Sequence, residues 1–266
     1  MGLELFDLSR SIQPWQNLQK ILMQEKKQEP VLSARGIGLQ RGNRWLFRDL
    51  DLDLYAGEFL AIVGPSGVGK TPLLSCLCGT LQPTEGSVSF KLSDSDGTKP
   101  ENLRRHFGIV YQELQLIPNA DLLTNVLCGQ LGRFHCLSTL LGFPKKHRQQ
   151  AYELLRELGV GENPHKWINH MSGGEKQRVA AARVLFQKPK IYFADEPVSS
   201  LDAYYAGRVL GLLRQEADEK AKPVLCVLHN AEHIQRFADI ALSLNQNDPK
   251  AHSIRRIRPE SGKVQL

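Results

Sequence analysis

The sequence has no apolar run long enough to cross a bilayer. A membrane-spanning helix needs about 18 consecutive apolar residues, and no segment of the 266-residue chain approaches that length. The N-terminus contains Glu4 and Asp7 and lacks the apolar stretch of a secretory signal. The sequence therefore argues against an integral membrane protein and against a secreted protein, and we expect the chain to stay in the cytosol.

Cysteine is also scarce, and its spacing fits neither a metal site nor a disulfide framework. The chain has five cysteines, an odd number. Cys76 and Cys78 lie two residues apart on a predicted helix, so their side chains would face different directions. We therefore expect ordinary reduced thiols at all five positions, which are Cys76, Cys78, Cys128, Cys136 and Cys226.

The chain lacks an excess of acidic residues and carries a formal net charge of +6. This charge would fit nucleic acid, an anionic membrane surface or simple phosphate groups, and it does not choose between them. The densest basic run, residues 252–263, lacks the interleaved aromatic residues of a nucleic-acid stacking surface. We expect residues 246–266 to form a solvated basic tail, with contact to a membrane surface as the alternative.

A phosphate-binding loop is the strongest local motif that is present. Residues 64–71 match the pattern G-x-x-x-x-G-K-[ST], between an apolar run at 59–63 and a helical pattern at 72–78. A strand, a glycine-rich turn and a helix would place backbone N–H groups around phosphates, with Lys70 at the outer phosphates and the Thr71 hydroxyl on magnesium. The predicted ATP-binding residues are Gly64, Pro65, Ser66, Gly67, Val68, Gly69, Lys70 and Thr71.

Two adjacent carboxylates follow a second predicted buried strand, at residues 190–194. In a nucleotide site, Asp195 would hold a magnesium ion, usually through water, and Glu196 would orient or deprotonate the attacking water. Alone, these two residues and Pro197 would more simply form a solvated acidic turn that ends a strand. The phosphate loop upstream favours the catalytic interpretation.

The run Ser-Gly-Gly-Glu-Lys-Gln-Arg at residues 172–178 predicts a helix N-terminus with free backbone N–H groups, which can bind an anion. Ser172 and Glu175 also satisfy the Ser-x-x-Glu capping box, which merely starts a helix well. The run alone does not decide between these interpretations, and both can hold at once.

The order of the motifs resembles the nucleotide-binding domain of the ATP-binding-cassette (ABC) family. The phosphate loop, Gln112, the run at 172–178, the two carboxylates, Asp202 and His229 follow one another as they do in that family. Other phosphate-loop ATPases lack the Ser-Gly-Gly element between the loop and the carboxylates. The motifs in this order are therefore more specific for the ABC family than any one motif alone.

The resemblance implies a fold and a domain organisation. The ATP-binding domain would span residues 31–245, as a RecA-like α/β phosphate-loop ATPase core with a mostly parallel sheet. An antiparallel β subdomain would be joined to it, and an α-helical subdomain would be inserted at about residues 113–171. Residues 1–30 would form an N-terminal extension and linker, and residues 246–266 the basic tail.

Hydrophobic periodicity agrees with this plan. The alternation at residues 31–34 and 50–54 predicts antiparallel strands, and the run at 224–228 predicts another buried strand. Residues 146–158 place apolar side chains on one face of a helix, which Gly159 would end.

In the family, ATP and Mg²⁺ lie between two protomers that face head to tail. The resemblance implies that Gln112 contacts the magnesium ion and the attacking water, and that His229 contacts the γ-phosphate and helps to hold Glu196 in place. The magnesium ligands would be Thr71, Gln112 and Asp195, and the catalytic residues Glu196, His229 and Gln112. The residues that meet the partner's ATP would be Ser172, Gly173, Gly174, Glu175 and Asp202.

Residues 123–134 and 195–202 are similar to the corresponding stretches of bacterial phosphonate-importer ATPases. This similarity implies a peripheral subunit on the cytoplasmic face of the cell membrane that drives import of phosphonate or a related oxyanion. Its partners would be a second ATPase protomer, the subunits of a transmembrane permease and, through the permease, an external solute-binding protein.

Two alternatives remain open at this point. One is an ATPase of the lipoprotein-release or macrolide-export type, and the other is a cytosolic cassette ATPase of a phosphonate-breakdown or mechanotransmission complex. No nucleic-acid partner is expected, because the region between Gln112 and Ser172 has no room for the long coiled coil of many nucleic-acid-handling cassettes.

Three positions depart from the family pattern. Pro72 replaces a residue whose backbone N–H normally meets the α-phosphate, and proline has no N–H. Gln40 or Arg41 stands where an aromatic ring normally stacks on adenine; the planar Arg41 guanidinium could stack there, with Trp45 as the aromatic rival. Glu175 stands where glutamine is commoner. None of these changes affects the phosphate-loop lysine or the predicted catalytic side chains, so we expect an active ATPase.

Overall fold

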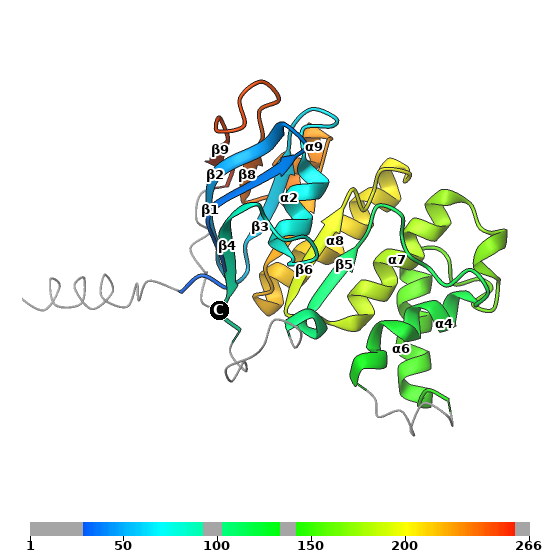
Figure 1. The fold of residues 1–266 in the computed structure, drawn as a ribbon. Coiled ribbons are helices and arrows are strands. Elements are labelled where there is room, and N and C mark those ends of the chain that lie inside the picture. Colours follow the sequence, from blue (N-terminus) through cyan, green and yellow to red (C-terminus); the bar gives the residue numbers. More distant parts are fainter. Residues whose placement is uncertain (1–28, 93–102, 134–141, 259–266) are drawn as a thin grey trace, which may run out of the picture.

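The computed structural model describes residues 29–92, 103–133 and 142–258. The predicted N-terminal extension up to residue 28, Cys136 and the final residues 259–266 of the predicted tail lie outside these ranges. The described chain forms two β-sheets with helices packed around them (Figure 1). The larger sheet positions most of the predicted site residues.

This larger sheet has six strands and forms the centre of the fold. Its strand order is β5-β6-β7-β3-β8-β9, with the first five strands parallel and β9 antiparallel to β8. The mostly parallel sheet and its helices confirm the predicted α/β fold. The strands are β3 (Phe59–Val63), β5 (Phe107–Val110), β6 (Ile191–Asp195), β7 (Val224–Val227), β8 (Ile240–Ser243) and β9 (Ser253–Arg256).

Side chains alternate between the two faces of this sheet and so belong to two separate cores. Phe59 and Ala61 of β3 pack into the core beneath the helices, whereas Leu60 and Ile62 pack into the core beneath the smaller sheet. All four side chains are fully buried. Burial on both faces explains why the parallel strands read as continuous apolar runs in the sequence.

A three-stranded antiparallel sheet covers one of these faces. Its strand order is β2-β1-β4, and the predicted strands at 31–34 and 50–54 pair in it through Leu32 and Leu54. Helix α2 packs against strands of both sheets. These elements are β1 (Leu32–Arg41), β2 (Arg44–Leu54), β4 (Glu85–Phe90) and α2 (Lys70–Leu77).

Helices cover the other face and extend into a lobe beside the sheet (Figure 1). The predicted helix at 146–158 is α6, and α7 packs against α4, α6 and α8. No helix among the described residues is long and apolar enough to cross a membrane. The helices and short 3₁₀ turns are α4 (Leu122–Leu127), α6 (Lys145–Glu157), α7 (Gly173–Gln187), α8 (Ala203–Lys220), α9 (Ala231–Phe237), η2 (Arg104–His106), η3 (Cys128–Arg133) and η4 (Ile168–His170).

The basic segment at residues 246–266 is not only a tail. Residues Ser253–Arg256 form β9, which pairs with β8 along its whole length. All four residues are exposed, so they carry no apolar pattern that sequence reasoning could detect. Their backbone nonetheless satisfies the hydrogen-bonding groups on the outer edge of β8. The sheet therefore extends beyond residue 245, where the sequence analysis ended the domain.

Four of the five cysteines lie in the described ranges, and none of these four forms a disulfide bond. Burial raises the pKa of the Cys76 thiol to about 12, so this thiol stays protonated at neutral pH. These four cysteines are Cys76, Cys78, Cys128 and Cys226.

A buried arginine joins α8 to the edge of the sheet where β3 and β8 begin. The Arg214 guanidinium lies 2.5 Å from the Asp239 carboxylate and donates to the Gly57 carbonyl oxygen at 3.0 Å. The same carboxylate accepts a hydrogen bond from the Phe59 backbone N–H at 2.8 Å. These contacts anchor the start of β3, the strand that leads into the phosphate loop.

We predict that Arg214→Met destabilises the protein by about 3 to 5 kcal/mol, because it leaves the largely buried Asp239 carboxylate without its cationic partner. Urea-induced unfolding measures the change. The matched control is Arg208→Met on the same helix, since Arg208 pairs with Glu157 at the surface with 46% of its side chain exposed. The control should alter stability by less than about 1 kcal/mol. Equal, small effects of both substitutions would contradict the anchoring role.

Candidate active site

The phosphate loop lies between the end of β3 and the start of α2. Its three glycines all have backbone angles that side chains disfavour, with φ of +145° at Gly64, +73° at Gly67 and +115° at Gly69. A Cβ atom at Gly64 would also lie 3.0 Å from the Leu244 carbonyl oxygen. Backbone conformation and packing therefore both require glycine here, and the loop turns so that α2 begins at Lys70.

Lys70 is held inside this loop. Its Nζ atom donates to the carbonyl oxygens of Gly64 at 3.0 Å and Pro65 at 2.9 Å, and only 5% of the residue is exposed. Burial lowers the pKa of the Lys70 ammonium, while the nearby Glu196 and Asp195 carboxylates oppose this shift. Within the described residues, the hydrogen-bond acceptors of this buried ammonium are neutral carbonyls, so it is well placed to bind an anion that enters the loop.

Asp195 ends β6 and lies next to Thr71. Its carboxylate interacts with the nearby Thr71 hydroxyl, and its Oδ1 atom is buried without a hydrogen-bond partner. Burial raises the pKa of this carboxyl group, the interaction with Thr71 lowers it, and the Glu196 charge acts in the same direction as burial. An unpartnered carboxylate oxygen beside a hydroxyl matches the oxygen ligands that Mg²⁺ prefers, so the residues present fit this ion.

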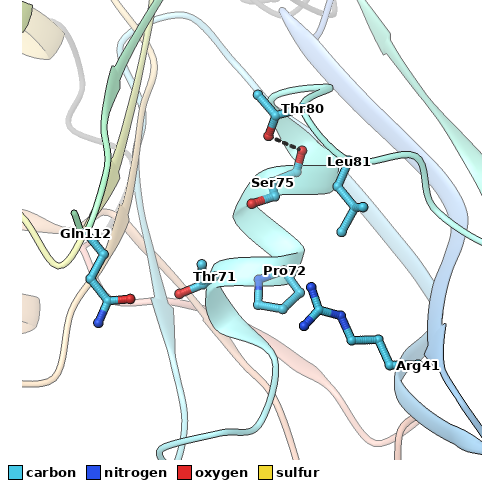
Figure 2. Close-up of a pocket in the computed structure, with 7 residues that line it drawn as sticks. All are labelled: Arg41, Thr71, Pro72, Ser75, Thr80, Leu81 and Gln112. Carbon is cyan, nitrogen blue, oxygen red and sulfur yellow. Dashed lines mark hydrogen bonds between the residues drawn. The ribbon is translucent and has the colours of Figure 1, made fainter. Parts of the chain in front are cut away.

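Gln112 follows β5, which pairs with β6 through Val110 and Ala194. Figure 2 shows its side chain facing Thr71 across a surface hollow. The three predicted magnesium ligands therefore come from neighbouring elements at one edge of the sheet. No group of three or more His, Cys, Asp or Glu side chains in the described chain could hold a metal ion, so a cation here would also need oxygens from water or a bound phosphate.

Glu196 and His229 are brought together by neighbouring strands. β6 and β7 pair through Asp195 and Val227, so the residues that follow them lie side by side. The His229 Nε2 atom lies 2.6 Å from the Glu196 Oε1 atom. Glu196 also has a left-handed backbone with φ of +50°, a conformation that a non-glycine residue keeps only where its neighbours hold it. The structure thus places the two side chains in contact, as the family resemblance implies.

The run at residues 172–178 begins helix α7 with a complete capping box. The Ser172 Oγ atom accepts from the Glu175 N–H at 3.2 Å, and the Glu175 carboxylate accepts from the Ser172 N–H at 2.8 Å. The bond from the Ser172 backbone lowers the pKa of the Glu175 carboxyl group. Ser172 and Gly173 remain exposed. The cap therefore leaves this end of the helix open to a second molecule.

The structure does not bring this run and the phosphate loop together into one site. Helix α2 contributes to the core beneath the smaller sheet, and α7 contributes to the core beneath the helices. In Figure 1, α2 lies beside β1 and β3, whereas α7 lies beyond β5 and β6. Asp202, the other predicted contact to a partner, caps α8 by accepting from the Tyr205 N–H at 2.9 Å and is exposed.

The surface hollow beside the first turn of α2 has a volume of about 390 Å³. Figure 2 shows the Arg41 guanidinium next to the Pro72 ring in this hollow. Trp45 is instead covered by the Arg48 guanidinium at 4.4 Å. Of the three candidates for the adenine contact, only Arg41 lines the hollow, whose residues are Arg41, Thr71, Pro72, Ser75, Thr80, Leu81 and Gln112.

Sequence reasoning did not single out Gln177, which the structure places behind Glu196. Only 4% of Gln177 is exposed, and its amide is hydrogen-bonded to the segment that follows β6. A signal was available, because Gln177 lies at helical spacing from the buried residues Ala180, Ala181 and Val184. A polar residue on the core face of a helix requires hydrogen-bond partners.

We predict that Asp195→Asn stabilises the magnesium-free, nucleotide-free protein by about 1 kcal/mol at neutral pH. The pKa of Asp195 is raised above its ordinary value of 3.8, so the ionised carboxylate disfavours the folded state. This unfavourable effect is absent below the ordinary pKa and grows as the pH rises toward the folded pKa. Thermal unfolding in EDTA should therefore show a gain that shrinks on acidification, and a gain independent of pH would contradict this account.

Comparisons with known proteins identify the family of this chain. Residues 47–199 match the protein family described as ABC transporter. The phosphonates import ATP-binding protein PhnC 2 of Oceanobacillus iheyensis is 32% identical over 223 residues, which cover 82% of this chain and 88% of that protein. The phosphite import ATP-binding protein PxtA of Stutzerimonas stutzeri is 37% identical over 198 residues, which cover 74% and 72%.

The solved structures include a similar cassette. The ATP-binding cassette MJ0796, in a dimeric post-hydrolysis state bound to ADP and Pi, is 27% identical with a TM-score of 0.73, over 86% of this chain and 99% of that chain. The family match spans more than half of the sequence and contains the phosphate loop and both carboxylates. This chain therefore belongs to the ABC transporter family.

Proposed function

We propose that this chain is the ATP-hydrolysing subunit of a transporter that imports phosphonate or a related phosphorus oxyanion. Membership of the ABC family supports the ATPase activity. The observation that carries the assignment of the site is the 2.6 Å contact between Glu196 and His229, at the sheet edge that also holds the phosphate loop. The substrate class is supported by the relatives, which are named for phosphonate and phosphite import.

ATP would bind through the backbone N–H groups of the phosphate loop and through Lys70. The Lys70 Nζ atom now donates to two carbonyl oxygens of the loop. A γ-phosphate is a charged and therefore stronger acceptor, so it would replace these carbonyls. Arg41 would stack on the adenine ring, because its guanidinium lines the hollow beside Pro72.

The unpartnered Asp195 Oδ1 atom, the Thr71 hydroxyl and the Gln112 side chain would hold the magnesium ion that accompanies ATP. This ion would neutralise charge on the phosphate oxygens. Binding would also give the buried Asp195 carboxylate the partner that it lacks.

Glu196 would orient the water molecule that attacks the γ-phosphorus atom and would accept its proton. As the new P–O bond forms, the bond to the β-phosphate oxygen breaks and ADP leaves. His229 contacts one oxygen of the Glu196 carboxylate. It would therefore hold Glu196 in place while its ring contacts the γ-phosphate. Gln112 would contact the water from the neighbouring strand end.

Two protomers that face head to tail would complete each ATP site. The N-terminus of α7 offers N–H groups to an anion but lies apart from its own phosphate loop, so the ATP that it meets would belong to the partner. The dimer of MJ0796 with ADP and Pi is consistent with this arrangement. The residues that meet the partner's ATP would be Ser172, Gly173, Gly174, Glu175 and Asp202.

The opening and closing of this dimer would drive a permease in the membrane. The chain would therefore be a peripheral protein on the cytoplasmic face of the cell membrane. An external solute-binding protein would deliver the oxyanion to the permease.

We predict that Glu196→Gln lowers ATP hydrolysis by about 10²- to 10⁴-fold, because the amide cannot accept the proton of the attacking water. ATP-dependent dimers should persist, since the phosphate loop and α7 are unchanged. Phosphate release and size-exclusion chromatography with ATP measure the two properties. Lys70→Ala serves as the control and should lose nucleotide binding and dimers together. Loss of dimers in Glu196→Gln as well would contradict the role assigned to Glu196.

Transport itself is tested by reconstitution. We predict that the tagged chain co-purifies from membranes with a multi-span permease, and that proteoliposomes of this complex take up a phosphonate or phosphite only with ATP. The same proteoliposomes with Glu196→Gln should take up none. Co-purification with soluble enzymes or RNA, and with no membrane protein, would contradict the transport function.

We predict that Pro72→Ala and Pro72→Thr both tighten ATP binding by about 1 to 3 kcal/mol, because either residue restores a backbone N–H for the α-phosphate. Pro72 lies in the first turn of α2. The backbone N–H of the next residue, Leu73, already donates to the Gly69 carbonyl oxygen at 2.8 Å. Calorimetric titration in the Glu196→Gln background measures the affinity. An unchanged affinity in both variants would contradict the N–H account, whereas a gain with threonine alone would assign the effect to its hydroxyl.

A further inference from the structure

The Gln177 side chain binds one segment of chain with its whole amide group. Its Nε2 atom donates to the Glu196 carbonyl oxygen at 2.8 Å and to the Ser199 Oγ atom at 3.3 Å. Its Oε1 atom accepts from the Ser200 backbone N–H at 2.9 Å. All three partners lie within residues 196–200, the turn that follows β6. Because the amide is buried, no water competes for these bonds.

The first turn of α7 also touches this segment directly. A Cβ atom at Gly174 would lie 2.9 Å from the Ser200 carbonyl oxygen, so glycine permits the close approach. Residues 196–200 therefore contact α7 at two successive turns, through the backbone at Gly174 and through the side chain at Gln177.

The attachment holds the Glu196 backbone in a conformation that it would not keep alone. Glu196 has φ of +50°, in the left-handed region that a non-glycine residue rarely adopts. Its carbonyl oxygen accepts from the Gln177 Nε2 atom and, at 3.3 Å, from the Ser199 N–H. The orientation of this peptide sets the direction in which the carboxylate leaves the backbone, and that carboxylate points at His229.

Gln177 lies five positions after Ser172 on the same helix. Ser172 lies at the exposed end that the proposed function assigns to the partner's ATP, whereas Glu196 belongs to the site of its own chain. We propose that Gln177 is a positioning residue that ties the Glu196 backbone to helix α7. The position of α7 against the partner's ATP would then determine the position of the Glu196 carboxylate in its own protomer.

This inference rests on the proposed function and adds to it a link between the two ATP sites of the dimer. A second contact on α7 supports such a role for the helix. Arg183 donates to the carbonyl oxygens of Leu114 at 2.8 Å and Gln115 at 2.7 Å. Both acceptors have left-handed backbones, with φ of +58° and +45°, and they follow Gln112 in the chain. Helix α7 therefore holds the loops that follow both β5 and β6.

The hydrogen bonds of Gln177 involve no residue of the phosphate loop. A defect at Gln177 should therefore appear in the rate of hydrolysis and leave ATP affinity unchanged. A purely structural role would instead lower the melting temperature without a selective effect on kcat.

The test compares two glutamines of the same helix. Gln177→Met keeps the volume of the side chain and removes its three bonds, and Gln177→Glu keeps an acceptor for the Ser200 N–H and removes the donor to Glu196. The matched control is Gln187→Met, because Gln187 also donates from α7 to a backbone carbonyl oxygen, that of Phe107 at 2.8 Å. Each variant is examined for kcat and KM of ATP hydrolysis, for binding of a fluorescent ATP analogue and for melting temperature.

We expect both Gln177 variants to lower kcat by about 10- to 100-fold, the effect of a small displacement of a catalytic group, with KM and analogue affinity changed by less than about twofold. Gln187→Met should keep kcat within about twofold of the wild type. A kcat for Gln177→Glu equal to that of Gln187→Met would overturn the positioning role, as would a parallel loss of analogue binding. The wild type and Glu196→Gln are measured alongside: an inactive wild type, or an active Glu196→Gln, would refute the proposed function itself.

Discussion

Parallel hydrogen bonding among β3, β5, β6 and β7 brings the carboxyl ends of four strands to one edge of the sheet. The phosphate loop, Gln112, Glu196 and His229 follow these strand ends, and Asp195 is the last residue of β6. The register is held by small, fully buried residues, with Ala61 and Ala194 both opposite Cys226. A slip by one residue would turn each apolar side chain toward the other core. The pairing register of these buried strands therefore determines which polar side chains meet at that edge.

The site that forms at this edge keeps several features that disfavour the folded state. The Asp195 carboxylate is buried with one oxygen unpartnered, the Lys70 ammonium is buried against neutral carbonyls, and Glu196 has a left-handed backbone. None of these would be selected for stability alone. Each feature would be useful in a site where phosphate oxygens, a cation and a water molecule supply the missing partners. Under the proposed function, ATP and its cation would complete the hydrogen bonds and charge pairs that the chain leaves open.

Helix α7 joins this edge to the helical lobe. Its capping box fixes an exposed N-terminus, Gln177 holds the turn that contains Glu196, and Arg183 holds the loop after Gln112. The same helix packs against α4 and α6. Under the proposed function, a shift of the helices packed on α7 would therefore reach the turn that contains Glu196 through this helix.

The parts of the site that depend on neighbouring residues could be predicted from the sequence. The strand, glycine turn and helix of the phosphate loop, the carboxylates at the end of β6 and the capping box of Ser172 and Glu175 are all local patterns, and the structure contains each of them. Alternation and continuous apolar runs also predicted the two kinds of sheet. The tertiary structure alone shows that Gln177 lies behind Glu196, that Arg41 rather than Trp45 lines the hollow, and that residues Ser253–Arg256 form an edge strand. These features arise from contacts between distant segments or from backbone hydrogen bonds. Helical spacing marks Gln177 as facing the core, but no local pattern identifies the partners of these residues.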